Sequence, residues 1–282
     1  MSLTTMPVRD GGARRVTRAL RFDPMAWLGI LLLLLVWELA ACLLPPAILP
    51  APLGVVRRLC SEFLSAPDLS YFGLANASLL GSMTYTAENV LLAMIVGAAF
   101  AIPLGLVTAR QELIRAVIDP VMMTVGTVPI LILAPFLLIW FGVGRASAVL
   151  LVTFYVIVVV YVAAQRAAEN IAPVFEDYAA TLGASPRAVL RDILIPATIP
   201  EILGGLRIAL AGAWGLEAVS ELLGAQQGIG KIIEVLAGAT DAQGIMAALL
   251  LLGLVATVCD GCAAWAIHRL TRWKSSTPVA GA

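Results

Sequence analysis

The chain has 282 residues, of which 61% are hydrophobic and 13% charged, and its formal net charge is zero. A charged fraction about half that of soluble domains excludes an ordinary water-soluble protein, and a neutral chain gives no indication of nucleic-acid binding. Four cysteines and one histidine are too few for a disulfide scaffold or for the paired axial ligands of a transmembrane b-type haem. Composition therefore predicts an integral membrane protein.

Apolar segments long enough to cross the roughly 30 Å hydrocarbon core of a bilayer occur six times. The first, from Met25 to Leu44, is too long for the apolar region of a cleavable signal peptide and lacks a small-residue cleavage site. The fifth is the weakest, because Arg207, Glu217 and Glu221 dilute it. The expected fold is an all-α integral membrane protein with six transmembrane helices, at 24–44, 84–108, 121–141, 146–165, 202–223 and 242–267.

The distribution of Lys and Arg predicts the orientation, because basic loops remain in the cytoplasm. Thirteen basic residues lie in the two tails and in the loops that follow the second and fourth spans. Only Arg57, Arg58, Arg145 and Lys231 lie in the opposite loops. Both termini are therefore expected on the cytoplasmic side of the cell (inner) membrane.

These assignments divide the chain into four parts. A cytoplasmic tail covers residues 1–23, and the first helix with a long outer connection covers 24–81. A core of five helices follows over 82–267 and includes a cytoplasmic loop over 166–197, and a second tail covers 268–282. Within the outer connection, residues 52–64 resemble a short interfacial helix.

The cytoplasmic loop contains the segment DYAATLGASPRAVLRDILIP, residues 177–196, which predicts two short helices joined by a turn. A helix over 172–182 would end at Gly183, a residue type that accepts positive φ. Ser185 suits the N-cap of a second helix over 186–194 and Pro186 its first position, with Pro196 near its end. Helices this short need a surface to pack against, either a partner or the membrane domain, although an ordered loop without a partner is the alternative.

The spacing in this loop resembles the pattern found in permeases of ATP-binding-cassette (ABC) importers, which is E-A-A, three residues, G, nine residues, I-x-L-P. Here Asp177-Tyr178-Ala179, Gly183 and Ile193-Leu194-Ile195-Pro196 stand at the same offsets, with Asp for Glu, Tyr for Ala and Ile for Leu. The stretches VWELAACLLPPAILPAP, IPLGLVTA, VPILILAPFLLIWFGVG and GLRIALAGAW…SELLGAQQGIG also resemble the nitrate/sulfonate/taurine branch of these permeases. The resemblance covers roughly residues 24–270.

The resemblance implies a type I importer permease in which the loop is the coupling helix that docks on a cytoplasmic ATPase. Gly183 would form the bend, Asp177 and Ala179 the docking face, and Arg187 and Arg191 flanking contacts. The implied partners are two ATPase subunits, a second copy of the chain and an extracytoplasmic solute-binding protein on outer loops 45–81 and 224–241. The implied solute is sulfonate-, taurine- or nitrate-like, and the implied coupling residues are Asp177, Tyr178, Ala179, Gly183, Ser185, Pro186, Arg187, Arg191 and Pro196.

No phosphate-binding loop of the form G-x-x-x-x-G-K-[ST] occurs in the sequence. The nearest match, AQQGIGKI at 225–232, lacks the first Gly and the Ser/Thr and lies on the outer side. The chain is therefore expected to be a transport subunit without catalytic residues, cofactor or metal, with ATP and Mg²⁺ bound by the partner ATPase. Cys259 and Cys262 form a C-x-x-C pair inside a span and are interpreted as packing residues.

Ionisable residues within spans are candidates for function. Glu217 and Glu221, four residues apart, share one helix face. Two carboxylates this close in a low-dielectric medium should not both stay ionised without a cation nearby, a role that Arg145 or Lys231 could serve. They could line the translocation path or its outer gate; alternatively they form interhelical hydrogen bonds or face a wet vestibule.

Other features of the spans bear on packing and on the path. Arg207 could pair with Asp192 or contact a passing anion, and Asp260 is expected to pair with Arg269 or a neighbouring helix. Small residues at 97, 101 and 105 predict close helix packing, and two prolines interrupt the third span. The candidates for the translocation path are Arg207, Trp214, Glu217, Glu221, Pro129 and Pro135.

A second function remains open, that of a stand-alone secondary transporter driven by an ion gradient. It would explain the acidic residues inside the membrane, but it gives the loop at 177–196 no role.

Overall fold

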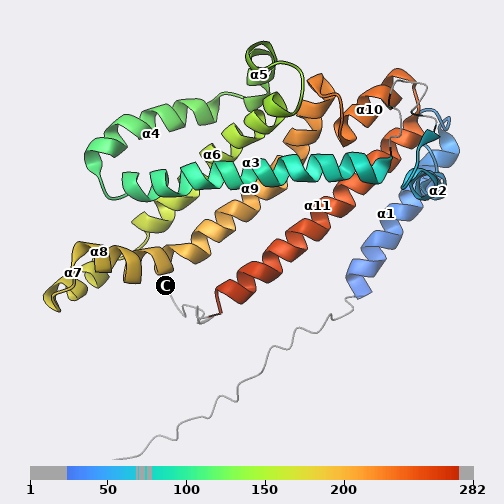
Figure 1. Ribbon diagram of the computed structural model, residues 1–282. Helices are drawn as coiled ribbons and strands as arrows, with labels where there is room; N and C mark the ends of the chain where they lie inside the picture. The colour runs from blue at the N-terminus through green and yellow to red at the C-terminus, as the bar shows by residue number, and fades with distance from the viewer. Residues whose placement is uncertain (1–23, 68, 70–73, 75–77, 273–282) are drawn as a thin grey trace, which may run out of the picture.

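The computed structural model describes residues 24–67, 69, 74 and 78–272, and in this part of the chain it is entirely helical. Helices α3 (Leu79–Thr108), α6 (Arg145–Glu169) and α9 (Ile195–Gly224) pack side by side as the core, and α11 (Ala242–Leu270) lies along α9 (Figure 1). At 1.5 Å per residue, the 30 residues of α3 span about 45 Å, enough to cross the bilayer core and extend beyond it. The predicted all-α membrane fold is confirmed.

Small residues bring α3 and α6 into close contact. Ala101 has no exposed surface, and Gly97 packs against Val156. A Cβ at Gly105 would lie 2.7 Å from the carbonyl oxygen of Tyr161. Because lipid tails are as apolar as the side chains, such helices associate through van der Waals packing rather than the hydrophobic effect. The close packing predicted for these three residues is confirmed.

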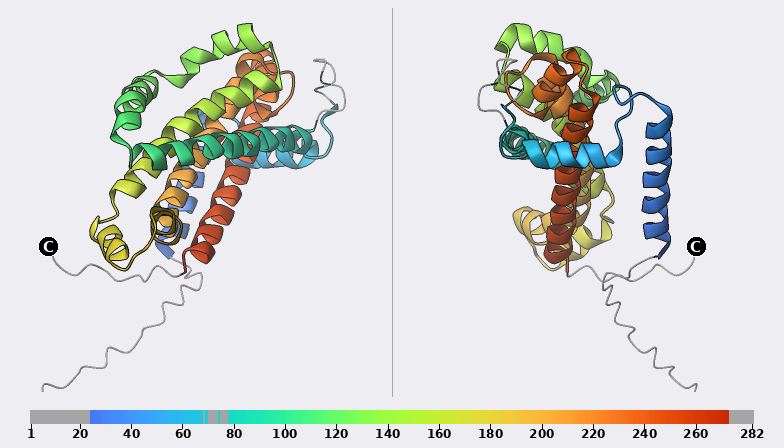
Figure 2. Two further views of the ribbon diagram at one scale, coloured as in Figure 1. Left: turned by 60° about the vertical axis from the view of Figure 1, so that its left-hand side comes forward. Right: turned by 90° about the vertical axis from the view of Figure 1, so that its right-hand side faces the viewer.

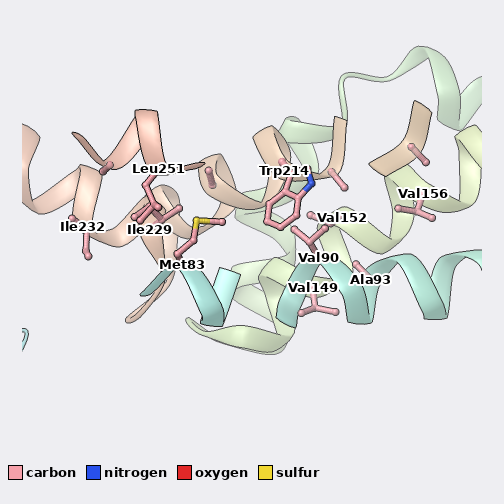
Figure 3. Close-up of a cluster of buried hydrophobic side chains, with 14 of the residues drawn as sticks. Met83, Val90, Ala93, Val149, Val152, Val156, Trp214, Ile229, Ile232 and Leu251 are labelled. Atoms are coloured by element: carbon pink, nitrogen blue, oxygen red, sulfur yellow. The ribbon is translucent and has the colours of Figure 1, made fainter. Parts of the chain in front are cut away.

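Apolar side chains from five helices complete the interior. Figure 3 shows Met83 and Val90 of α3 beside Trp214 of α9, together with Ile229 of α10 (Ile229–Gly238) and Leu251 of α11. The helix α10 was not predicted, because residues 224–241 had been assigned to an outer loop. Its contacts join α9 and α11 at the outer end of the bundle.

Helix α1 (Pro24–Leu43) stands apart from the core, as the right-hand view of Figure 2 shows. Its main contact is with α2 (Pro52–Glu62), which lies against α11 and confirms the short helix expected at 52–64. The indole nitrogen of Trp37 donates a hydrogen bond of 3.0 Å to the carbonyl oxygen of Pro50, which fixes the turn between the two helices.

The third expected span is not one helix. It consists of α4 (Glu112–Thr127), a 3₁₀ turn (Ile130–Leu133) and α5 (Ala134–Phe141), with α4 bent by 90° from the following segment. Val128 is extended before Pro129, which cannot donate a helical hydrogen bond. Pro135 lies in the first turn of α5, where it is tolerated and interrupts nothing. Within the described residues, five helices are long and apolar enough to cross the membrane, or six if the bent pair counts as one span.

The second helix of the cytoplasmic loop also differs from the prediction. After α7 (Val174–Thr181), α8 (Pro186–Val189) continues through a π-helical turn (Leu190–Leu194) directly into α9, so the helix does not end near Pro196. The wider π turn accommodates a proline, whose ring clashes with the carbonyl four residues earlier in a regular α-helix. Residues 186–224 consequently form one continuous helical rod.

Figure 1 shows that α7, α8 and the last turn of α11 gather at one end of the bundle, and the described chain begins at this end with α1. Helices α2, α5 and α10 lie at the opposite end. This arrangement agrees with the orientation predicted from basic residues, which places the first end in the cytoplasm and the second outside.

We expect Gly105→Leu to destabilise the bundle by about 1–3 kcal/mol, because an enlarged side chain must push α3 away from the α6 backbone. The matched control is Gly253→Leu on α11, where a Cβ meets nothing within 4 Å. Thermal unfolding in detergent, followed by size-exclusion chromatography, should show a lower midpoint for Gly105→Leu alone. Equal midpoints for the two variants would contradict the packing argument.

Candidate functional sites

The cytoplasmic helix α7 carries an exposed apolar stripe. Phe175, Tyr178 and Leu182 are 58%, 67% and 87% exposed, and their spacing of three and four residues places them on one side of the helix. Asp177 is exposed beside them, whereas Ala179 is buried and its carbonyl oxygen accepts a hydrogen bond of 3.0 Å from the amide of Ala184. Of the two residues predicted for the docking face, one therefore lies on the surface and one inside the loop.

Sequence reasoning missed Phe175 and Leu182 as surface residues. Apolar residues on a short helix normally face the body of the protein, and their spacing does not reveal which side packs. Only the folded chain shows that this side of α7 is exposed, while Glu176 on the same helix pairs with Arg110.

The turn between α7 and α8 has the geometry that the sequence predicts. Gly183 has a φ of +83°, a conformation that side chains with a branched Cβ rarely adopt. The Ser185 hydroxyl accepts a hydrogen bond of 3.3 Å from the amide of Ala188, and Pro186 occupies the first turn. Arg187 and Arg191 are exposed on the same segment, and Pro196 lies in the first turn of α9.

Polar contacts attach this loop to the core. Arg110, just after α3, forms an ion pair of 2.6 Å with Glu176 of α7 and donates a hydrogen bond of 3.2 Å to the carbonyl oxygen of Ala168 in α6. Asn170, which follows α6, donates a hydrogen bond of 2.8 Å to Glu201 of α9. The stripe on α7 is therefore held in a fixed relation to three core helices.

A second polar cluster holds the exposed helix α4 against α6. The Asp119 carboxylate accepts hydrogen bonds from the hydroxyl of Tyr161, from Gln165 at 2.8 Å and from Arg115 at 3.1 Å. Arg115 also pairs with Glu169 at 2.7 Å. Since α4 has no buried residue, these contacts contribute much of its attachment to the core.

At the outer end, Glu221 of α9 joins three helices although it has no exposed surface. The hydroxyl of Thr86 on α3 lies 2.8 and 2.9 Å from its two carboxylate oxygens, and the amide of Gly230 donates a bond of 2.9 Å to one of them. The amide of Ile229 donates to the Thr86 hydroxyl at 3.0 Å. A negative charge at the N-terminus of α10 is stabilising.

The glycines of the QQGIG stretch follow from this arrangement. Gly228 has a φ of +105°, and a Cβ there would meet the Glu221 carboxyl group. A Cβ at Gly230 would meet the Ala218 carbonyl oxygen and lie 2.7 Å from Cβ of Glu221. Interhelical hydrogen bonding was the alternative to a place on the translocation path for Glu221, and it is the geometry observed.

Glu217 lies one turn earlier on α9 and also has no exposed surface. The two cations considered for these glutamates are paired elsewhere: Arg145 with Glu88 at 3.0 Å and Lys231 with Glu234 at 2.6 Å. Among the described residues neither therefore forms an ion pair with Glu217 or Glu221, although Arg145 lies near enough to act on Glu217 through its charge.

Arg207 forms a two-pronged ion pair with Asp260 of α11, with both nitrogen–oxygen distances at 2.6 Å. Pairing of Arg207 with Asp192 is therefore wrong, and pairing of Asp260 with a neighbouring helix is confirmed. Arg269 instead lies over the ring of Trp265, 5.2 Å from its centroid.

The structure separates the candidates for the translocation path into two groups. Trp214, Glu217 and Glu221 are buried between helices of the single chain. Arg207, Pro129 and Pro135 are exposed. Only the second group offers surface to a solute in this conformation.

The C-x-x-C pair on α11 has unlike surroundings. Cys259 is half-buried against the core, whereas Cys262 is exposed. Among the residues that the structure describes, no group of three His, Cys, Asp or Glu side chains could hold a metal ion.

The chain is similar to known transport proteins over most of its length. It is 28% identical over 243 residues to the taurine transport system permease protein TauC of Escherichia coli K12, with 86% of each chain covered. It is 29% identical over 234 residues to the formylaminopyrimidine transport permease protein ThiX of Halalkalibacterium halodurans, covering 80% of this chain and 86% of that one.

Solved structures show the same fold. The MetNI methionine ABC transporter in an inward-facing conformation matches with a TM-score of 0.62 at 19% identity, over 69% of this chain and 96% of that one. A bacterial alginate ABC transporter in complex with a periplasmic protein matches with a TM-score of 0.53 at 17% identity, over 94% and 100% of the two chains.

Residues 101–275 match the family described as binding-protein-dependent transport system inner membrane component. The chain belongs to this family and is a multi-pass inner-membrane permease subunit of an ABC importer.

Proposed function

We propose that α7 and α8 dock on a cytoplasmic ATPase subunit and transmit its movements to the membrane helices. The observation that carries this proposal is the exposed stripe of Phe175, Tyr178 and Leu182. Binding of a partner over large apolar side chains on a cytoplasmic helix is favourable in free energy, because it removes their apolar surface from water. An eight-residue helix is also too short to be stable without packing.

In this proposal ATP and Mg²⁺ bind to the partner, and this chain contributes no catalytic residue. One chain carries one docking element, so a pair of ATPase subunits requires two permease copies, which we propose form a homodimer in the bilayer. An extracytoplasmic solute-binding protein would dock on the outer surface formed by α2 and α10.

We propose a small polar solute of the sulfonate, taurine or nitrate type. Relatives named for transport of taurine and of aliphatic sulfonates support this class of solute. The path would run along the break between α4 and α5, where Pro129 and Pro135 are exposed. A role for Trp214, Glu217 or Glu221 in contacting solute would require α9 to separate from its neighbours.

Purification of the tagged chain from its native membrane in mild detergent, followed by mass spectrometry, tests the assembly. We expect two nucleotide-binding subunits for every two permease chains. A chain that emerges alone, even with ATP analogues present, would contradict the proposal and favour a transporter driven by an ion gradient.

We expect Gly183→Val to abolish solute-stimulated ATP hydrolysis by the complex, because a β-branched residue at a φ of +83° is strained by about 1–2 kcal/mol or more and shifts α7 against α8. Gly183→Asn is the matched control, since Asn tolerates positive φ and a Cβ at this position meets nothing within 4 Å. Both variants should reach the membrane in wild-type amounts. Normal solute-stimulated ATP hydrolysis in Gly183→Val would show that the bend at Gly183 has no role in coupling.

Charge reversal tests whether the Arg110–Glu176 ion pair transmits movement from α7. Either Arg110→Glu or Glu176→Arg should lower the ratio of solute transported to ATP hydrolysed, because it replaces the attraction of the 2.6 Å ion pair by repulsion between like charges. The double exchange restores opposite charges but not the bond to Ala168, so we expect partial recovery. Additive losses in the double variant would show that the two residues act separately.

A further inference from the structure

Glu217 of α9 and Asn89 of α3 form a buried pair of polar side chains. Neither residue has exposed surface. Asn89 faces the Glu217 carboxyl group across the interface of the two helices. Among the described residues, both carboxyl oxygens of Glu217 and both polar side-chain atoms of Asn89 lack a hydrogen-bond partner. Buried polar atoms are nearly always paired, so four unpaired atoms at one place require an explanation.

The neighbouring carboxyl group, Glu221, shows how a buried carboxyl group can be satisfied in this interior. It is equally buried, yet it accepts hydrogen bonds from Thr86 and from the amide of Gly230 at the start of α10. The helix terminus stabilises its charge. Glu217 has no helix terminus or hydroxyl group in the same role.

Among the described residues, no charged group forms an ion pair with Glu217. On α3, Glu88 pairs with Arg145 of α6, and that arginine also lies over the ring of Tyr85. On α10, Lys231 pairs with Glu234. Glu221, on the same face of α9, is a second carboxyl group, and two neighbouring carboxyl groups disfavour ionisation of both.

The surroundings of the pair are largely apolar, although the buried indole nitrogen of Trp214 is also unpaired among the described residues. Val90 follows Asn89 on α3, and Trp214 lies one turn before Glu217 on α9, both within the hydrophobic cluster of Figure 3. An isolated carboxylate in such a medium is strongly disfavoured relative to its neutral form.

We propose that Glu217 and Asn89 form a proton-binding site inside the membrane domain, in which the Glu217 carboxyl group is protonated at neutral pH and pairs reciprocally with the Asn89 amide. The proton comes from water and forms an O–H bond on one carboxyl oxygen. That O–H donates to the Asn89 carbonyl oxygen, and the Asn89 amino group donates to the other carboxyl oxygen.

Hydrogen-bonding capacity distinguishes the two protonation states. An ionised carboxylate only accepts hydrogen bonds, so it would satisfy the amino group of Asn89 and leave the carbonyl oxygen of Asn89 without a donor. The neutral acid has one donor and one acceptor side, which match those of the amide. Protonation would therefore give all four orphaned atoms a partner.

Infrared difference spectroscopy of the purified full-length protein tests this proposal directly. At neutral pH the wild type should show the C=O stretching band of a protonated carboxylic acid, shifted downward in D₂O and absent from Glu217→Gln. Glu88→Gln, which removes an exposed and ion-paired carboxylate, should retain the band. Because the readout does not involve transport, it is independent of the proposed docking and solute.

A second variant tests the pairing itself. Asn89→Ala removes the acceptor of the Glu217 O–H, so the band should move to higher frequency while remaining sensitive to Glu217→Gln. Glu217→Gln should itself fold with the wild-type unfolding midpoint, because an amide can replace a neutral acid opposite Asn89. Any of three outcomes would overturn the proposal. The spectrum could be unchanged in Glu217→Gln, the band could be unshifted in Asn89→Ala, or Glu217→Gln could fail to fold.

Discussion

Close contact between α3, α6 and α9 is the constraint on which the rest of the structure depends. Gly105 lets the backbone of α3 approach α6, and Gly205 of α9 packs with equal closeness against Ala163 of α6. Where helix backbones approach this closely, side chains between them lose all access to lipid and water. Nearer the outer end, Glu217, Glu221 and Asn89 are also fully buried, and their chemistry must be completed inside the chain.

The sequence predicts most of the fold because hydropathy and length identify the spans. It fails where a local break decides the geometry. Residues 121–141 are apolar enough for a span, but the number of apolar residues does not show that the chain bends by 90° near Pro129. Helix α10 is amphipathic and only ten residues long, so it lacks the continuous apolar run that marks a transmembrane helix.

Local chemistry predicts the docking loop better than it predicts the buried glutamates. Positive φ at Gly183 and the cap at Ser185 depend on neighbouring residues alone, and both are observed. Glu217 and Glu221 look equivalent in sequence, since they are four residues apart on one helix face. Their difference depends on Thr86, which lies 135 residues from Glu221 and meets it only in the folded chain.

The continuous helical rod from Pro186 to Gly224 connects the two ends of the molecule. Its cytoplasmic end carries the proposed docking element, and near its outer end Glu221 binds the start of α10. A regular helix transmits displacement along its axis, whereas the π turn at Leu190–Leu194 interrupts the regular α-helical pattern of backbone hydrogen bonds. Movement of α8 would therefore be taken up partly at this turn and transmitted along α9 to Glu221 and the start of α10. The buried Glu217–Asn89 pair lies between these points, where α9 must remain attached to α3 if the two ends are to move together.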